Sequence, residues 1–248
     1  MNIPIVISEK SFQVAWAKAV KELSLNKWEA WNVIVQIDNP ELINNDFNIL
    51  LNEFAKSKNF LPPKHVAHTI FPQSFFTKGI SRDKFYRNYS RFFNRPRDNP
   101  RSGWGTYFLR MVNYQTKEGE IDQLGRIIDN INNRTKNYKV CYTIIIPYPD
   151  KDLNRTRGGP CLNYLTIQPE IINNSTSRVI NLLAVYRNHD FTNRTYGNYL
   201  GLCNFIKYIA YETKSKVGKL TCVSSHAYFD GYNSELLNIA NSILEKAP

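Results

Sequence analysis

The 248-residue sequence lacks the features that mark several protein classes. No apolar run reaches the roughly 18 residues that a membrane-spanning helix needs, so we expect no membrane segment. The four cysteines form no Cys-x-x-Cys pair and no zinc-ligand spacing, which argues against a disulfide framework and a metal centre. No basic segment precedes an apolar stretch at the start, so we expect no secretory signal. These absences favour a cytoplasmic globular protein.

Acidic residues are also scarce relative to basic ones, and the net charge is +11. The excess gathers between Lys78 and Arg110, where aromatic residues interleave with the basic ones. One interpretation is attraction of an anion, either a nucleotide or a nucleic acid. The other is a solvated helix with an aromatic inner face. The basic residues are Lys78, Arg82, Lys84, Arg87, Arg91, Arg95, Arg97, Arg101 and Arg110.

Hydrophobic spacing predicts helices mixed with strands, several of them consecutive. The prolines and glycines between residues 72 and 105 predict a short helix embedded in long loops. No repeat or linker divides the chain, so we expect one α+β domain, residues 1–248, with a large mixed β-sheet flanked by helices. The predicted helices cover 12–25, 42–56, 121–131, 198–213 and 234–246, and the predicted strands cover 31–37, 139–147, 162–168, 178–186 and 219–224.

Cys161 differs from the other cysteines because it follows Gly158-Gly159-Pro160 at a loop-to-strand junction. A nucleophilic cysteine needs partial exposure and electropositive surroundings that lower the thiol pKa. Arg155 and Arg157 precede Cys161, but a purely structural cysteine remains an alternative. The other three lie in strand or helix patterns and are expected to be buried small hydrophobes: Cys141, Cys203 and Cys222.

Polar residues end two predicted strands. Arg187-Asn188-His189-Asp190 ends one of them, and Arg187 could hold a phosphate bidentately, although a simple strand exit is equally open. His226 and Tyr228 follow another strand and could bind one ligand hydroxyl group, or form an ordinary surface pair. Asn198 opens the long helix, where an N-cap role is the default.

The order and spacing of these motifs resemble the thymidylate synthase and pyrimidine nucleotide hydroxymethylase family. The resemblance covers about half of the chain, roughly residues 105 to 229. Upstream, Ile121-Asp122-Gln123-Leu124 and the strand after it are similar to the family's segment leading to its catalytic loop. The motifs are Pro160-Cys161, Arg187-x-x-Asp190, Asn198, Val217-Gly218 and His226-x-Tyr228.

The resemblance implies a thymidylate synthase-like fold, a homodimer and a defined chemistry. The Cys161 thiolate would add to carbon 6 of a uridine-type nucleotide monophosphate, dUMP or UMP. Carbon 5 would then take a one-carbon unit from 5,10-methylenetetrahydrofolate, giving a methylated or hydroxymethylated product. Tyr107 would match the family's active-site tyrosine.

The resemblance also assigns binding roles. Arg187 and Asn188 would bind the phosphate, and Asp190 would face the folate pterin. Asn198 would read the base edge; the related cytidylate hydroxymethylases carry aspartate there, so asparagine favours uracil. The sugar 3′-hydroxyl would be held by the remaining pair, His226 and Tyr228.

Several family residues are replaced. Leu162 stands where a histidine normally follows the cysteine, and only Lys139 keeps a charge where paired arginines would reach a phosphate across the dimer. His65 stands where the family has its glutamate general base, with Glu53 as a second candidate. Residues 72–103 form a basic, aromatic insertion. These replacements leave open a second function, a catalytically degenerate protein that binds a nucleotide, or a nucleic acid through segment 78–110.

Overall fold

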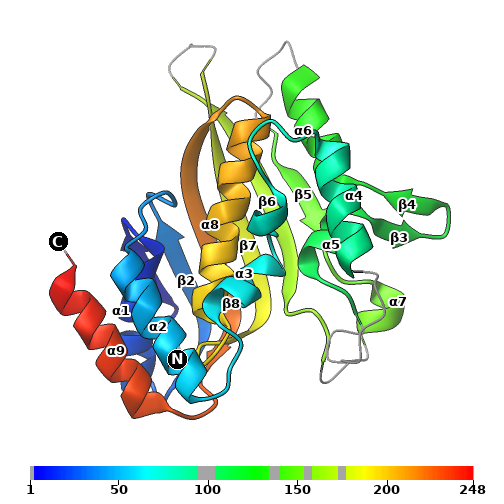
Figure 1. The fold of residues 1–248 in the computed structure, drawn as a ribbon. Helices are drawn as coiled ribbons and strands as arrows, with labels where there is room; N and C mark the ends of the chain where they lie inside the picture. Colours follow the sequence, from blue (N-terminus) through cyan, green and yellow to red (C-terminus); the bar gives the residue numbers. More distant parts are fainter. Residues whose placement is uncertain (1–2, 94–103, 134–139, 154–157, 173–176, 248) are drawn as a thin grey trace.

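A six-stranded mixed sheet forms the centre of the computed structural model, which describes residues 3–93, 104–133, 140–153, 158–172 and 177–247 (Figure 1). The strand order is β1-β2-β8-β7-β6-β5. The pairs β1/β2 and β7/β8 are parallel, and the other neighbours are antiparallel. The strands are β1 (Ile5–Glu9), β2 (Glu29–Ile37), β5 (Tyr142–Ile145), β6 (Leu162–Ile171), β7 (Arg178–Asp190) and β8 (Lys216–Tyr228).

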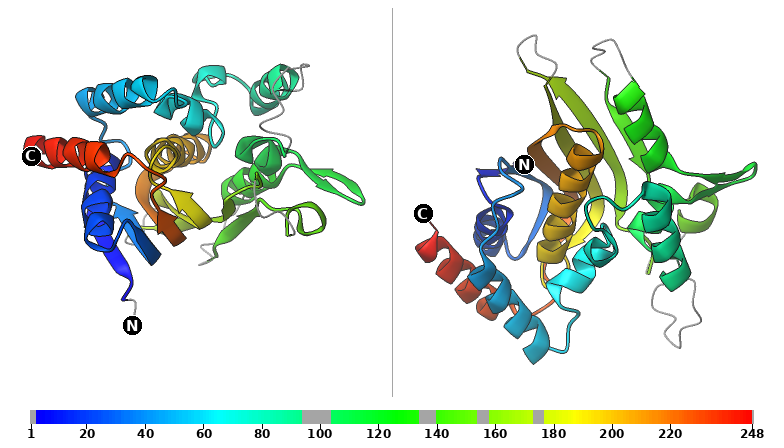
Figure 2. Two further views of the ribbon diagram at one scale, coloured as in Figure 1. Left: turned by 90° about the horizontal axis from the view of Figure 1, so that it is seen from below. Right: turned by 45° about the horizontal axis from the view of Figure 1, so that its top comes forward.

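Helices cover one face of this sheet (Figure 2). Alternate residues of β7, such as Leu182 and Ala184, are buried against them, whereas Leu183 and Val185 between them are half-buried. Successive side chains of a strand point to opposite faces of the sheet, so this alternation is expected where helices cover only one of the two faces. The helices are α1 (Phe12–Leu25), α2 (Asn45–Ser57), α3 (Pro63–His68), α4 (Arg82–Phe93), α5 (Tyr107–Val112), α6 (Gln123–Asn133), α7 (Pro149–Asp152), α8 (Thr195–Glu212) and α9 (Asn233–Lys246).

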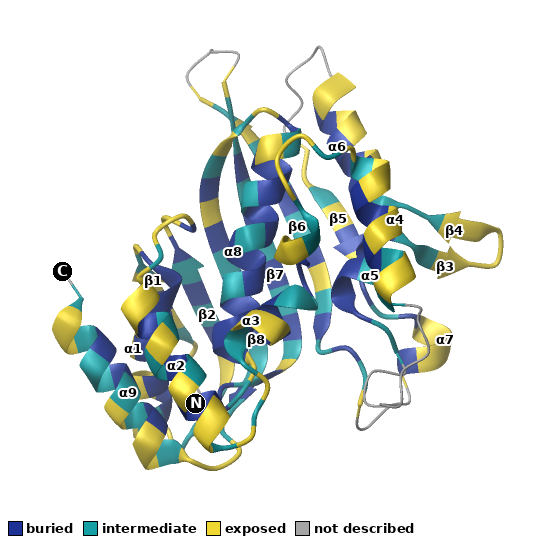
Figure 3. Ribbon diagram, in the orientation of Figure 1, coloured by how far each residue is buried: buried dark blue, intermediate teal, exposed yellow. Residues whose placement is uncertain are grey.

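The central helix α8 packs on β7 and β8 and is buried along most of its length (Figure 3). Helix α3 crosses it closely because α8 carries glycines at the contact. A Cβ atom on Gly197 would lie 2.6 Å from the Val66 Cβ, and one on Gly201 would lie 2.8 Å from the Ala67 carbonyl oxygen. A larger side chain at either position would push the two helices apart.

The predicted fold class is confirmed in its coarse form, as one mixed α/β domain with a large sheet flanked by helices. Helices α1 and α9 lie within a few residues of their predicted bounds. Strands β7 and β8 extend beyond the predicted ends, and their polar ends pair with one another: Asn188 with His226, and Asp190 with Tyr228. The polar residues that were expected to follow the ends of these strands therefore belong to the strands themselves.

Several elements were not predicted. They are strand β1, helices α3 and α5, the hairpin of β3 (Tyr114–Thr116) and β4 (Gly119–Ile121), the 3-10 turn Gln73–Phe75, and helix α7, which lies partly in the predicted loop 150–159. The N-cap role considered for Asn198 is wrong, because α8 begins at Thr195 and the side chain of Asn198 is buried in its first turn. The expectation that Cys141 is buried is also wrong, because β5 begins after it and Cys141 is exposed.

The basic, aromatic segment contains the expected helix with an aromatic inner face. In α4, Phe85, Tyr86 and Tyr89 are buried. Arg82 is ion-paired with Asp129, and Arg110 of α5 is buried, so neither adds to an open basic surface. The exposed basic residues of the segment are Lys78, Lys84, Arg87 and Arg91; Arg95, Arg97 and Arg101 lie outside the described residues.

Among the described residues, no helix has the length and apolar character needed to cross a membrane.

Candidate functional site

Cys161 lies half-buried directly before β6, and two other predicted site residues contact it. Its backbone N–H donates to the Tyr107 hydroxyl oxygen at 3.3 Å. The Arg187 backbone N–H donates to the Cys161 carbonyl oxygen at 2.9 Å, and the Arg187 Nε donates to the Pro160 carbonyl oxygen at 3.2 Å. The fold thus brings together three residues that lie far apart in the sequence.

Burial and charge act on the Cys161 thiol in opposite directions. Burial raises its pKa and is the dominant effect. The Arg187 guanidinium lowers the pKa through its charge and a hydrogen bond, the nearby Asp190 raises it, and Arg194 lowers it. The net pKa is raised, so the thiol form predominates in the free protein at neutral pH. The cationic neighbour that a thiolate would need is nevertheless in place.

Tyr107 is buried, and burial raises the pKa of its hydroxyl group to about 12. The hydroxyl group is therefore neutral at physiological pH, so it can donate a proton as well as accept the Cys161 N–H bond. It is packed beside Trp104, whose ring centroid lies 4.8 Å from that of Tyr107.

Asp190 shapes the turn between β7 and α8. Its Oδ1 accepts the backbone N–H groups of Thr192 at 2.8 Å and Asn193 at 3.3 Å, and its carbonyl oxygen accepts the Thr195 hydroxyl group at 2.7 Å. Its second carboxylate oxygen makes no hydrogen bond to the described residues. Burial raises the pKa of Asp190, against the backbone N–H bonds, which lower it.

A buried polar chain lies behind this turn. The Asn198 Nδ2 lies 3.1 Å from the His189 Nε2, and the His189 Nδ1 lies 2.8 Å from the Ser224 Oγ. The His189 ring stacks on Tyr186 with a centroid distance of 4.0 Å and an interplanar angle of 4°. Burial lowers the pKa of His189 to about 3, so the imidazole is neutral. Sequence reasoning gave His189 no role, although it stands inside the Arg187–Asp190 motif.

A second polar group joins the ends of β2, β7 and β8. The His226 Nδ1 lies 3.2 Å from the Asn188 Oδ1, and its Nε2 lies 2.7 Å from the Glu29 Oε1. The His226 ring also stacks between Trp31 and Tyr228, at centroid distances of 4.5 and 5.3 Å. The predicted pair His226 and Tyr228 is thus side by side, but both His226 ring nitrogens already have partners. Glu29 and Trp31 were missed by the sequence analysis.

Within the described residues, no side-chain hydrogen bond, ion pair or ring contact joins the predicted acid–base residues to this cluster. His65 is exposed on α3, and no hydrogen bond or ion pair joins its side chain to another described residue. Glu53 is exposed on α2. Lys139 lies outside the described residues, as does Tyr138 beside it.

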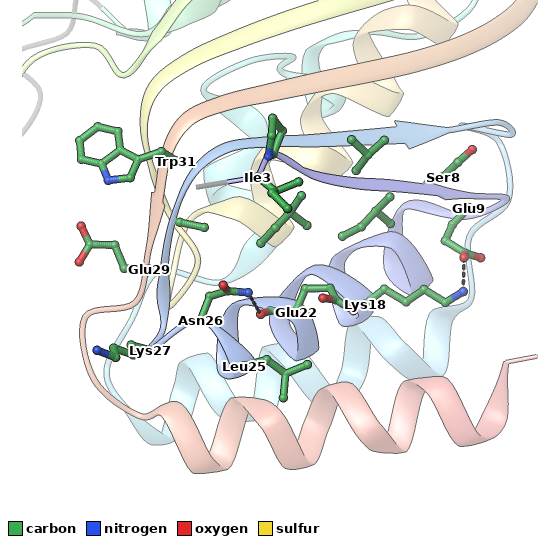
Figure 4. A pocket seen from close by; sticks show the side chains of 15 residues that line it. Ile3, Ser8, Glu9, Lys18, Glu22, Leu25, Asn26, Lys27, Glu29 and Trp31 are labelled. Carbon is green, nitrogen blue, oxygen red and sulfur yellow. Dashed lines mark hydrogen bonds and ion pairs between the residues drawn. The ribbon is translucent and has the colours of Figure 1, made fainter. Parts of the chain in front are cut away.

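A hollow of about 1000 Å³ runs along the edge strand β1 and the end of α1 (Figure 4), and Cys161 is not among the residues that line it. Its polar side chains include the ion pair of Lys18 and Glu9, and Asn26, which donates to the Glu22 carbonyl oxygen. At one end it reaches Glu29 and Trp31. None of the residues that line it is a cysteine, so we place the candidate site at Cys161.

Within the described residues, no group of three or more histidine, cysteine, aspartate and glutamate side chains could hold a metal ion. No protein-family model matches the chain, and no curated protein matches it.

Proposed function

We propose that this chain is a thymidylate synthase-like one-carbon transferase that acts at carbon 5 of a uridine-type nucleotide monophosphate, dUMP or UMP. The observation that carries the proposal is the position of Arg187 beside the half-buried Cys161 thiol. A guanidinium in this place can bind an anionic phosphate and stabilise the thiolate. The order of motifs along the sequence supports the same reaction.

In the proposed reaction, the Cys161 Sγ forms a bond to carbon 6 of the pyrimidine. The electron pair of the carbon 5–carbon 6 double bond moves toward carbon 5 and its carbonyl neighbour, and carbon 5 becomes nucleophilic. Carbon 5 would then take the one-carbon unit and lose its proton to a base, and the bond between that unit and the folate nitrogen would break. A hydride supplied by the folate would complete a methyl group, with dihydrofolate as the by-product, or water would complete a hydroxymethyl group, with tetrahydrofolate as the by-product. Expulsion of the Cys161 thiolate would restore the double bond and regenerate Cys161. Covalent addition thereby activates an otherwise unreactive vinyl carbon.

Methylenetetrahydrofolate, the proposed cofactor, would supply the one-carbon unit when bound. Asp190 fits a pterin because one carboxylate oxygen is held by backbone N–H groups while the other makes no hydrogen bond within the described chain. A fixed carboxylate of this kind can accept a ring N–H bond. The neutral Tyr107 hydroxyl group, next to Cys161, can pass on the proton that carbon 5 loses. His65 is retained as the proposed acid–base residue for that proton.

The nucleotide would lie across the ends of β6, β7 and β8. Arg187, Asn188 and Lys139 would bind its phosphate, and Asn198 would read its base. The sugar hydroxyl group would bind near His226 and Tyr228. The Glu29 carboxylate accepts a hydrogen bond from the His226 ring and therefore lies next to this position. Glu29 would be a further hydrogen-bond acceptor for the sugar hydroxyl group.

We also propose that two copies pair through the helix-free face of the sheet. Val6 and Ile145 on this face are 69% and 51% exposed, although each lies next to a buried neighbour in its strand. Apolar exposure over several strands is typical of a subunit interface. Light scattering should give the mass of a dimer for the wild type, and a smaller mass after Val185→Lys at the centre of that face.

The second candidate function is a non-catalytic nucleotide- or nucleic-acid-binding protein. The exposed basic residues of α4, Lys84, Arg87 and Arg91, favour it. Such binding depends on phosphate contacts and weakens steeply with salt. This function predicts RNA or DNA binding that the triple substitution of these residues to glutamine abolishes.

A product assay tests the main proposal. The protein is incubated with dUMP or UMP and methylenetetrahydrofolate, and mass spectrometry identifies any nucleotide modified at carbon 5. Cys161→Ser should abolish the product, and Cys141→Ser, which changes an exposed cysteine elsewhere, should leave it unchanged. Equal product from wild type and Cys161→Ser would contradict the proposed mechanism.

A further inference from the structure

A second hollow, of about 670 Å³, lies between α4 and the base of the hairpin of β3 and β4 (Figure 1). Arg87 and Arg91 of α4 line it from one side, and Asn113, Glu120 and Asp122 line it from the other. Its volume lies in the range of ligand pockets, about 300–1,000 Å³. No residue of the candidate site described above lines it.

The two arginines carry positive charge that no described carboxylate neutralises. On α4, Arg82 forms an ion pair with Asp129, whereas no ion pair joins the exposed Arg87 or Arg91 to another described residue. The two guanidinium groups stand one helical turn apart, and like charges at this spacing destabilise a helix. An anion bound by both groups would relieve that repulsion. Guanidinium groups bind phosphate through two parallel hydrogen bonds, and a phosphate group has enough oxygen atoms to serve two of them.

Asn113 brings a further donor to the hollow. The Gln115 Nε2 lies 2.9 Å from the Glu120 Oε1 and 3.1 Å from the Asn113 Oδ1. An ionised carboxylate can only accept hydrogen bonds, so the amide nitrogen of Gln115 must face Glu120. The same nitrogen then requires the oxygen of Asn113, which fixes the Asn113 amide as well. The Asn113 Nδ2 makes no hydrogen bond to the described residues and can donate to an anion.

The carboxylates of Glu120 and Asp122 restrict which phosphate compound the hollow suits. One oxygen of each carboxylate is engaged, by the Gln115 amide in Glu120 and by the Gly125 backbone N–H at 2.7 Å in Asp122. Neither second oxygen makes a hydrogen bond to the described residues. Two carboxylates repel a second phosphate group, whereas hydroxyl groups can donate to them. The hollow therefore suits a single phosphate group joined to a hydroxylated part.

We propose that this hollow binds a ribose phosphate, with the phosphate group on Arg87, Arg91 and Asn113 and the sugar hydroxyl groups on Glu120 and Asp122. A free ribonucleoside monophosphate and a nucleotide within RNA both carry this group. The inference rests on the second candidate function, binding through α4, and names its ligand; it does not depend on the reaction proposed above. The 2′-hydroxyl group is the donor that deoxyribose lacks, so the proposed contacts predict a preference for ribose.

Calorimetric titration with AMP, dAMP, a hexaribonucleotide of mixed sequence and its deoxy counterpart tests this inference. AMP is a suitable probe because the proposed contacts involve only phosphate and sugar, and because a purine is not the substrate proposed for Cys161. The wild type should bind at least one of the ribose ligands about 2- to 10-fold more tightly than its deoxy form. Binding of AMP identifies a free nucleotide as the ligand, and binding of the hexaribonucleotide alone identifies RNA. The double variant Arg87→Gln/Arg91→Gln should weaken binding about 10-fold or more.

Matched variants separate the hollow from the open surface of α4. Asn113→Ala, on the side opposite α4, should weaken binding about 2- to 10-fold. Lys84→Gln changes an exposed basic residue of α4 that does not line the hollow, and it should weaken binding at most about 3-fold. Glu120→Met should reduce the preference for ribose, whereas Glu118→Met, on the same hairpin but outside the hollow, should keep it.

Three results would overturn the inference. If Asn113→Ala leaves the affinity unchanged while Lys84→Gln and the double arginine variant weaken it equally, the ligand binds to the open basic surface, and the second candidate function stands without this site. If Arg187→Met weakens AMP binding as strongly as the double arginine variant does, the ligand binds at Cys161. If the wild type binds none of the four ligands, the second candidate function fails together with the inference.

Discussion

Replacing Asp152 with alanine is expected to destabilise the protein strongly, because it would leave a buried guanidinium without its carboxylate. Asp152 of α7 forms an ion pair with Arg110 of α5, and their side chains are 4% and 5% exposed. Asp152 also accepts the Tyr148 backbone N–H at 2.8 Å. This pair holds the start of the segment that leads to Cys161.

The expected loss of folding stability in Asp152→Ala follows from the interactions that Arg110 keeps. Its bonds to the carbonyl oxygens of Ile146 at 3.0 Å and Trp104 at 3.1 Å persist, but they do not neutralise its charge. Removing one partner of a buried pair typically costs about 3–5 kcal/mol. A chain of this size loses about 2–4 °C in melting temperature per kcal/mol, so we expect a drop of about 6–20 °C.

Urea unfolding and thermal melting of Asp152→Ala measure this loss. Asp129→Ala is the matched control, since it breaks the Arg82–Asp129 pair, in which Asp129 is 53% exposed. That exposed pair should contribute at most about 1 kcal/mol. The double variant Arg110→Met/Asp152→Leu should recover much of the lost stability, because it removes both charges. A loss no larger for Asp152→Ala than for Asp129→Ala would refute the reasoning.

Two further predictions concern the candidate site. Arg187→Met should slow alkylation of Cys161 by iodoacetamide at neutral pH, because it removes the charge that lowers the pKa of the thiol. Peptide mapping measures the alkylation rate of Cys161 relative to that of the exposed Cys141. An unchanged ratio of these two alkylation rates between the wild type and Arg187→Met would contradict the prediction. The pKa of His189, about 3 in the folded protein, lies below its ordinary value of 6.5, so its stabilising contribution is complete above pH 6.5 and is lost as the pH falls toward 3. Between pH 7 and pH 5, protonation of His189 in the unfolded chain should lower the free energy of unfolding of the wild type by about 2 kcal/mol. In urea titrations at the two pH values, His189→Phe should lose about 2 kcal/mol less stability than the wild type.

The sequence predicts the longer helices well because their signal is local. In α1, apolar residues recur at helical spacing, and Ser11 caps the helix by accepting the Val14 N–H. Short elements escape prediction, since the five residues of β1 and the six of α3 are too few for a periodic pattern. Their stability comes from the partner strand β2 and from the glycines of α8.

The candidate site was predictable only in part. The order of motifs along the chain suggested Cys161, Tyr107 and Arg187, and these residues are in contact. Glu29 and Trp31 could not be predicted, because their place beside His226 depends on the register between β2 and β8. The same limit applies to His189, whose partners lie 9 and 35 residues away on other elements.

Release of tritium from carbon 5 of labelled dUMP and UMP tests the central claim most directly. Addition of the Cys161 thiolate at carbon 6 should labilise the carbon 5 hydrogen, so the wild type should release tritium and Cys161→Ser should not. Dependence of the release on methylenetetrahydrofolate would show that one-carbon transfer follows. No release from either nucleotide, or equal release from Cys161→Ser, would contradict carbon 5 activation by Cys161.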